Sequence, residues 1–168
     1  TSRPWGVIIF SRNIRSFYQL KKLTEQIRNI FNDPKYPILI DEEGGKVNRL
    51  NKIINFKIFS QEFLGKKYKN NKKDFDKKYK NYINLVSFIL SEAGININTS
   101  PVLDIKNKIS NNIIGNRAFS SNIEVIKNIG NLCIEFYKKN KIGTVIKHIP
   151  GHGRSNNDSH FFTPIIKT

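Results

Sequence analysis

Short apolar runs alternate along this chain with longer segments in which apolar residues recur every three or four positions. A short, continuous apolar run closed by polar residues is typical of a buried strand. The longer segments have amphipathic helical spacing, with Ser16 as a start signal and residues 32–34 and Gly94 as stop signals. We expect strands at 5–10, 37–40, 95–98 and 141–147, and helices at 17–31, 59–64, 75–90 and 123–139. This alternation predicts a parallel sheet with crossover helices.

Two architectures satisfy the alternation, a doubly wound sheet and a TIM-type barrel. In a barrel the carboxyl ends of the strands converge on the face that carries active sites. Polar residues follow the predicted strands at those ends: Arg12, Asn13, Asp41, Glu42, Asn98, Asp104, Lys147 and His148. No glycine-rich loop of the dinucleotide-binding type follows the first strand, which disfavours the doubly wound alternative. We therefore predict an α/β fold of the (β/α)8 TIM-barrel type.

The length of 168 residues limits how much of such a barrel the chain can form. It suits a single domain over 1–168 with a core of its own. A complete barrel has eight strands and typically about 250 residues, whereas about four strands are identifiable here. The chain also contains no methionine. We expect a partial barrel from a longer domain, with open sheet edges and apolar surfaces that favour association.

A formal charge of +16 raises the hypothesis of a nucleic-acid or other anionic partner. The basic residues are densest over 66–80, where lysines alternate with Asn and Asp as on a solvated helix face. No recognisable nucleic-acid motif accompanies them, so we predict no nucleic-acid partner.

The single cysteine bears on the compartment. Cys133 falls in an apolar helical pattern, where a cysteine behaves as a small hydrophobe and forms no internal disulfide. A reducing compartment fits, and we expect a cytoplasmic protein. No apolar run approaches the roughly 18 residues of a membrane span, so no membrane partner is expected.

Asp41 is the first candidate site residue. It directly follows a predicted strand and precedes Gly44 and Gly45, which let the backbone turn closely beneath it. Arg49, Arg117 and Lys147 could join its carboxylate in holding a polyhydroxylated or anionic ligand. The alternative is an ordinary acidic turn with separate surface cations.

All three histidines lie in one polar segment, KHIPGHGRSNNDSH at 147–160. With Asp158 they could bind a metal, but the spacing matches no standard metal motif, so we expect none. The segment could also be only structural, with glycines for turning. In a third interpretation, Asp158 orients His160 as an acid/base dyad on a flexible loop. The residue types alone leave these three open.

Several stretches together resemble one family: IDEEGGKVNRL at 40–50, SPVLDI at 100–105, IGNRAFS at 114–120, KHIPGHG at 147–153 and DSH at 158–160. They are similar to glycoside hydrolase family 3, specifically the bacterial β-N-acetylglucosaminidases of peptidoglycan recycling. The resemblance implies a TIM-type barrel without a cofactor or a metal. It also implies removal of terminal non-reducing N-acetylglucosamine from muropeptide fragments by a retaining mechanism. The expected partner is an N-acetylglucosamine-containing saccharide.

The same resemblance implies roles for single residues. Those expected to bind the N-acetylglucosamine ring are Asp41, Arg49, Arg117, Lys147 and His148. His160 is expected to be the general acid/base, held by Asp158, in place of the second carboxylate of most retaining glycosidases.

The chain departs from the family pattern at five positions. Glu42 stands where Gln is usual, and Lys46, Asn116, Ile149 and Arg154 replace Arg, Asp, Phe and an acidic residue. We expect these changes to tune binding and Arg154 to alter the pH behaviour of His160. The nucleophilic aspartate of the family lies downstream of the DSH motif and is not expected within this chain. A non-catalytic sugar-binding remnant is therefore the alternative function, with a basic nucleic-acid binder as a third.

Overall fold

A computed structural model describes residues 3–107, 114–155 and 161–165. Its centre is a sheet of four parallel strands in the order β1-β2-β3-β4. The strands are β1 (Val7–Ile9), β2 (Ile38–Ile40), β3 (Ile97–Asn98) and β4 (Gly143–Thr144). The helices are α1 (Phe17–Phe31), α2 (Gln61–Asn70), α3 (Lys72–Glu92) and α4 (Ile123–Lys139), with short 3-10 turns η1 (Ser11–Asn13), η2 (Gly115–Arg117) and η3 (His152–Arg154). The predicted alternation and the parallel sheet are confirmed.

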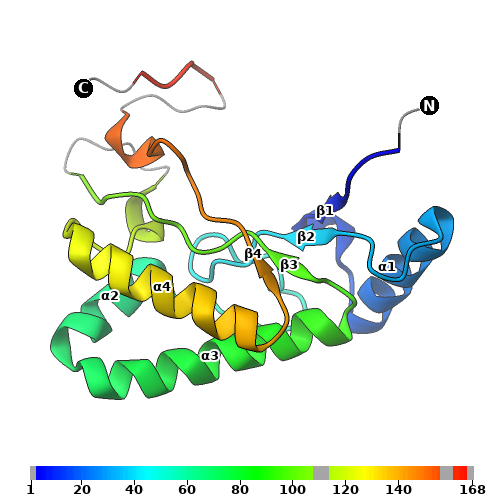
Figure 1. Cartoon of the computed structure of the whole chain (residues 1–168), viewed down its shortest axis with the longest axis horizontal. Helices are drawn as coiled ribbons and strands as arrows, with labels where there is room; N and C mark the ends of the chain where they lie inside the picture. Colours follow the sequence, from blue (N-terminus) through cyan, green and yellow to red (C-terminus); the bar gives the residue numbers. More distant parts are fainter. Residues whose placement is uncertain (1–2, 108–113, 156–160, 166–168) are drawn as a thin grey trace.

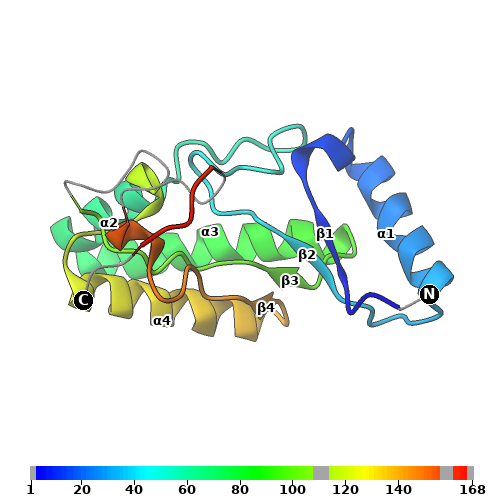
Figure 2. The ribbon, with the colours of Figure 1, turned by 90° about the horizontal axis from the view of Figure 1, so that it is seen from above.

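The helices lie along one face of the sheet. Figure 1 shows α3 and α4 side by side below the strands, and Figure 2 shows α1 beside β1 and α4 beside β4. Ile9, Ile38 and Ile40 point into the core on this face and are at most 3% exposed. Ile8 and Leu39, which are partners in the β1–β2 register, point to the other face, where Ile8 is 40% exposed. A parallel sheet with helices outside and an apolar inner face is part of a TIM-type barrel, as predicted.

Helices α2 and α3 are longer than the apolar pattern predicts. Ser60 caps α2 by accepting the Phe63 N–H at 3.2 Å, and Asn71 caps α3 by accepting the Asp74 N–H at 3.0 Å. Each helix also has an i,i+4 ion pair on its charged turns. Lys66 pairs with Glu62 in α2 at 2.9 Å, and Lys78 pairs with Asp74 in α3 at 2.8 Å. Every lysine over 66–80 is exposed, as expected of a solvated surface.

The last strand is shorter than predicted. We expected a strand over 141–147, but only Gly143 and Thr144 pair regularly with β3. Among the described residues β4 has a neighbour on one side only, and Val145 and Ile146 are 42% and 41% exposed. Pairing resumes at Lys147, which forms a parallel bridge with Val102. This bridge places the end of the β4 segment beside the loop that carries Asp104.

Cys133 is buried in the α4 face of the core, as its apolar pattern predicts. Burial raises the pKa of its thiol to about 12, so the thiol stays protonated. In the part of the chain that the structure describes, no helix has the length and hydropathy needed to cross a membrane.

Candidate functional site

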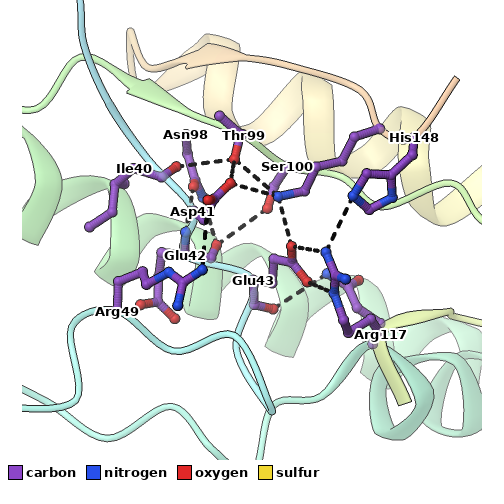
Figure 3. A network of polar contacts seen from close by, with 12 residues as sticks. Ile40, Asp41, Glu42, Glu43, Arg49, Asn98, Thr99, Ser100, Arg117 and His148 are labelled. Carbon is purple, nitrogen blue, oxygen red and sulfur yellow. Dashed lines mark hydrogen bonds and ion pairs between the residues drawn. The ribbon is translucent and has the colours of Figure 1, made fainter. Parts of the chain in front are cut away.

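Polar side chains gather where β2, β3 and β4 end, as Figure 3 shows. Asp41 and Glu43 follow β2, Thr99 follows β3, and Lys147 and His148 extend from β4. Because parallel strands end at the same edge of a sheet, residues far apart in the sequence meet here.

Asp41 is held by residues from three segments. Its Oδ1 accepts hydrogen bonds from the Thr99 hydroxyl and from Lys147 Nζ, the latter at 2.8 Å. Arg49 Nη2 lies 3.8 Å from Oδ2. Burial favours the neutral acid, but the hydrogen bonds from Lys147 and Thr99 and the charges of Lys147 and Arg49 outweigh it and lower the pKa of Asp41. Asp41 is therefore ionised at neutral pH and can accept hydrogen bonds from a ligand.

Lys147 joins Asp41 to Glu43. Its Nζ lies 2.7 Å from Glu43 Oε1 and donates to Thr99 Oγ1 at 3.1 Å. Glu43 also binds Arg117 in a bidentate pair, with Nε and Nη2 each 2.8 Å from a carboxylate oxygen. The Glu43 side chain is fully buried, whereas 13% of the Arg117 side chain remains exposed. Burial lowers the pKa of Arg117, but the hydrogen bonds and the charge of Glu43 outweigh this effect, and the net pKa is raised. Arg117 therefore stays a cation.

Asp104 fixes the orientation of His148. Its Oδ2 lies 2.6 Å from His148 Nδ1 and accepts the His148 backbone N–H at 3.1 Å, while its Oδ1 accepts the Gly153 N–H at 2.7 Å. Burial raises the pKa of Asp104, but the hydrogen bonds from His148 and Gly153 lower it below its usual range. His148 Nε2 lies 3.4 Å from Arg117 Nη2, which can only donate. The geometry therefore places a proton on Nδ1 and leaves Nε2 to accept.

Beneath these residues lies Glu42, whose carboxylate accepts the Gly44 and Leu50 backbone N–H groups at 3.1 and 2.9 Å. Only 1% of this residue is exposed. Burial raises its pKa to about 7, and the charge of Glu43 adds to the effect, although the backbone hydrogen bonds oppose it. An isosteric glutamine at this position would not titrate.

The structure brings together all five residues that the sequence suggested for a binding site: Asp41, Arg49, Arg117, Lys147 and His148. Their role in sugar binding stays a prediction. His160 and Asp158, the predicted dyad, lie outside the described residues. Within the described ranges, no group of three or more His, Cys, Asp or Glu side chains is placed to hold a metal ion.

No role was predicted from the sequence for Glu43, Thr99 or Asp104. Glu43 is the partner of both Lys147 and Arg117, Thr99 binds Asp41, and Asp104 orients His148. The available signal was weak: Glu43 belongs to an acidic triplet before two glycines, and Asp104 follows a strand.

A hollow of about 360 Å³ adjoins the cluster. It is lined by His148, Ile149, Pro150, His152 and Pro164. Carboxylate acceptors, cationic donors and an oriented imidazole next to an apolar hollow suit a ligand with several hydroxyl groups.

Comparisons with known proteins agree with this geometry. The model of the glycosyl hydrolase family 3 N-terminal domain matches residues 5–168. A beta-hexosaminidase of Neisseria gonorrhoeae is 32% identical over 161 residues, which are 95% of this chain and 44% of that protein. A beta-hexosaminidase of Hydrogenovibrio crunogenus is 32% identical over 155 residues, which are 92% of this chain and 43% of that protein.

Solved structures give the same result. The structure of native NagZ from N. gonorrhoeae has a TM-score of 0.82 and 28% identity, covering 95% of this chain and 46% of that one. NagZ in complex with N-trifluoroacetyl-D-glucosamine gives the same TM-score at 29% identity. The chain thus spans less than half the length of these relatives. With a family match over residues 5–168 and a partial barrel of the expected kind, the chain belongs to glycosyl hydrolase family 3.

Proposed function

We propose that the cluster at the strand ends binds the terminal, non-reducing N-acetylglucosamine of a saccharide. The observation that carries this proposal is the chain of contacts from Asp41 through Lys147, Glu43 and Arg117 to His148. These contacts fix donors and acceptors on one edge of the sheet before any ligand arrives, which reduces the entropy lost on binding. The solved complex of a related NagZ with an N-acylated glucosamine supports the choice of sugar.

In this proposal each side chain has a separate task. Asp41 accepts hydrogen bonds from sugar hydroxyl groups, while Lys147 and Arg117 donate to sugar oxygens. His148 is kept in one tautomer by Asp104 and offers Nε2 at the edge of the hollow. Charged partners give the stronger hydrogen bonds to such groups.

We further propose that the chain takes part in the hydrolysis of N-acetyl-β-D-glucosaminides in muropeptide fragments, and that this reaction follows a retaining mechanism. His160, held by Asp158, would protonate the leaving oxygen while a carboxylate nucleophile, expected downstream of the DSH motif, attacks the anomeric carbon. His160 would then activate the water that hydrolyses the glycosyl-enzyme. The names of the relatives support the reaction class, since they are beta-hexosaminidases. The single buried thiol of Cys133 supports a reducing, cytoplasmic compartment.

Calorimetry with N-acetylglucosamine tests the binding proposal. Wild-type chain should bind, and Asp41→Ala should weaken binding by about tenfold or more, because a charged acceptor is lost. Asp33→Ala, at a carboxylate on the far end of α1, is the matched control and should bind like wild type. Equal affinity of the Asp41→Ala variant and wild type would remove Asp41 from the site.

Turnover is tested separately with an aryl N-acetyl-β-glucosaminide. In a protein that contains this chain together with the downstream nucleophile, loss of hydrolysis in His160→Ala with sugar affinity retained supports the dyad, whereas unchanged turnover contradicts it. Sugar binding without any turnover by that longer protein would favour the alternative, a binding module without hydrolase activity.

A further inference from the structure

Glu42 lies directly beneath the proposed sugar site and belongs to none of its surface contacts. Its main chain is fixed by β3, because Asn98 accepts the Glu42 N–H at 3.0 Å and donates to the Glu42 carbonyl at 2.8 Å. Its side chain turns into the loop that follows β2 and is buried there. Oε1 accepts the Gly44 N–H and Oε2 accepts the Leu50 N–H, so both carboxylate oxygens are engaged within this loop.

The loop from 41 to 50 presents two of the candidate sugar-binding side chains, Asp41 and Arg49. It bends sharply at Gly44 and Gly45, whose φ angles of 74° and 63° lie in the left-handed region that favours glycine. With its amide nitrogen turned toward Glu42, Asn48 also donates to Oε2 at 3.2 Å. The carboxylate is therefore the common acceptor around which this loop closes.

The protonation state of Glu42 matters for this closure. Both oxygens of the Glu42 carboxylate accept hydrogen bonds from backbone N–H groups. A proton on one of these oxygens would make that oxygen a donor facing another donor, and its hydrogen bond would be weakened. The titratable groups that face it are Glu43 in its own segment, Tyr82 on α3 and Tyr137 on α4. Both tyrosines are buried with a raised pKa, so they stay neutral, and Glu43 is the negative neighbour.

We propose that Glu42 is a positioning residue for the sugar site: its carboxylate holds the 41–50 loop through Gly44 and Leu50, and loss of its charge loosens the presentation of Asp41 and Arg49. The inference rests on the proposed function for its effect on sugar binding. It rests on the contacts alone for its effect on the loop. Because burial and the charge of Glu43 raise the pKa of Glu42 to about 7, the change of state falls near neutral pH. Sugar affinity should rise as the pH increases through that value.

The loop is tested without any ligand, by nuclear magnetic resonance of the whole chain over a pH titration. The Gly44 and Leu50 amide resonances should titrate together near pH 7 in wild type and lose that transition in Glu42→Gln. Glu135→Gln, at an exposed glutamate on α4, is the control and should titrate like wild type. Wild-type Gly44 and Leu50 amides with no transition near neutral pH overturn the inference, whether or not the Glu42→Gln variant folds.

Calorimetry with N-acetylglucosamine then tests the effect on the site. Wild type should bind about threefold to tenfold more tightly at about pH 8 than at about pH 6, as expected for one hydrogen bond gained. Glu42→Gln should lose this difference. An equal pH effect in wild type and Glu42→Gln overturns the positioning role. Absence of sugar binding by wild type at both pH values instead overturns the proposed function, a result that the amide titration distinguishes.

Discussion

Replacement of Glu42 by Gln should change how the stability of the chain depends on pH. Burial raises the pKa of this carboxyl from an ordinary value near 4.5 to about 7, so the folded state binds its proton more tightly than the unfolded state. At about 1.4 kcal/mol per pKa unit, the difference corresponds to roughly 3.5 kcal/mol. The stability that the proton provides is complete below about pH 4.5 and is lost as the pH rises to about 7.

The comparison between the two chains isolates this effect. Between about pH 5 and about pH 8, wild type should lose roughly 2 to 3 kcal/mol of unfolding free energy relative to Glu42→Gln, which cannot titrate. An approximately constant offset accompanies this change, because the amide group of Gln offers one acceptor where the carboxylate offers two. The prediction concerns the difference between the two chains in how their unfolding free energy changes with pH, and not the constant offset.

Urea unfolding followed by circular dichroism at several pH values measures the two curves. Glu135→Gln serves as the control, because its exposed carboxyl should leave the wild-type slope unchanged. Parallel curves for wild type and Glu42→Gln would refute the reasoning, since they would mean that the buried carboxyl titrates alike in the folded and unfolded chain.

Three other predictions follow from the packing. Arg117→Ala should cost about 1 to 3 kcal/mol in urea unfolding, because the fully buried Glu43 carboxylate loses its bidentate partner but keeps Lys147; a loss below about 0.5 kcal/mol would contradict this. Gly65→Ala should destabilise the chain by several kcal/mol, since a Cβ there would lie 1.8 Å from the Phe119 carbonyl oxygen, and a thermal midpoint equal to wild type would refute the contact. Native Cys133 should react with a thiol reagent only after unfolding, because it is buried with a pKa of about 12, and rapid reaction of folded protein would show otherwise.

The alternation of strands and helices could be predicted because each buried strand carries its own signal in consecutive apolar residues. The extents of α2 and α3 could not be predicted from apolar spacing, since Ser60 and Asn71 extend these helices through charged turns. The length of β4 depends on its neighbours, and half-exposed Val145 and Ile146 lack a second strand beside them in the described sheet. Local pattern thus gives element type, whereas tertiary context sets where each element ends.

The candidate site shows the same division. Asp41 and Lys147 could be found because they follow strands and fall in motifs that resemble a known family. Glu43 could not, because its partner Arg117 is 74 positions away and its burial depends on the folded sheet. Asp104 likewise acquires its role only through His148, 44 positions further on. A carboxylate that acts by holding another side chain has no signature in its own neighbourhood of the sequence.

The alternating contacts around Lys147 also determine how the site responds to salt. In the described cluster, the carboxylates of Asp41 and Glu43 face the cations of Arg49, Arg117 and Lys147, and Asp104 pairs with His148. The formal charge of the whole chain is +16. The outer charge attracts anions and is screened by added salt, whereas the buried pairs are screened much less. The pocket is close to electrically neutral inside a strongly basic surface. Binding of an uncharged sugar should therefore be nearly independent of ionic strength, although the same salt changes what the surface of the chain attracts.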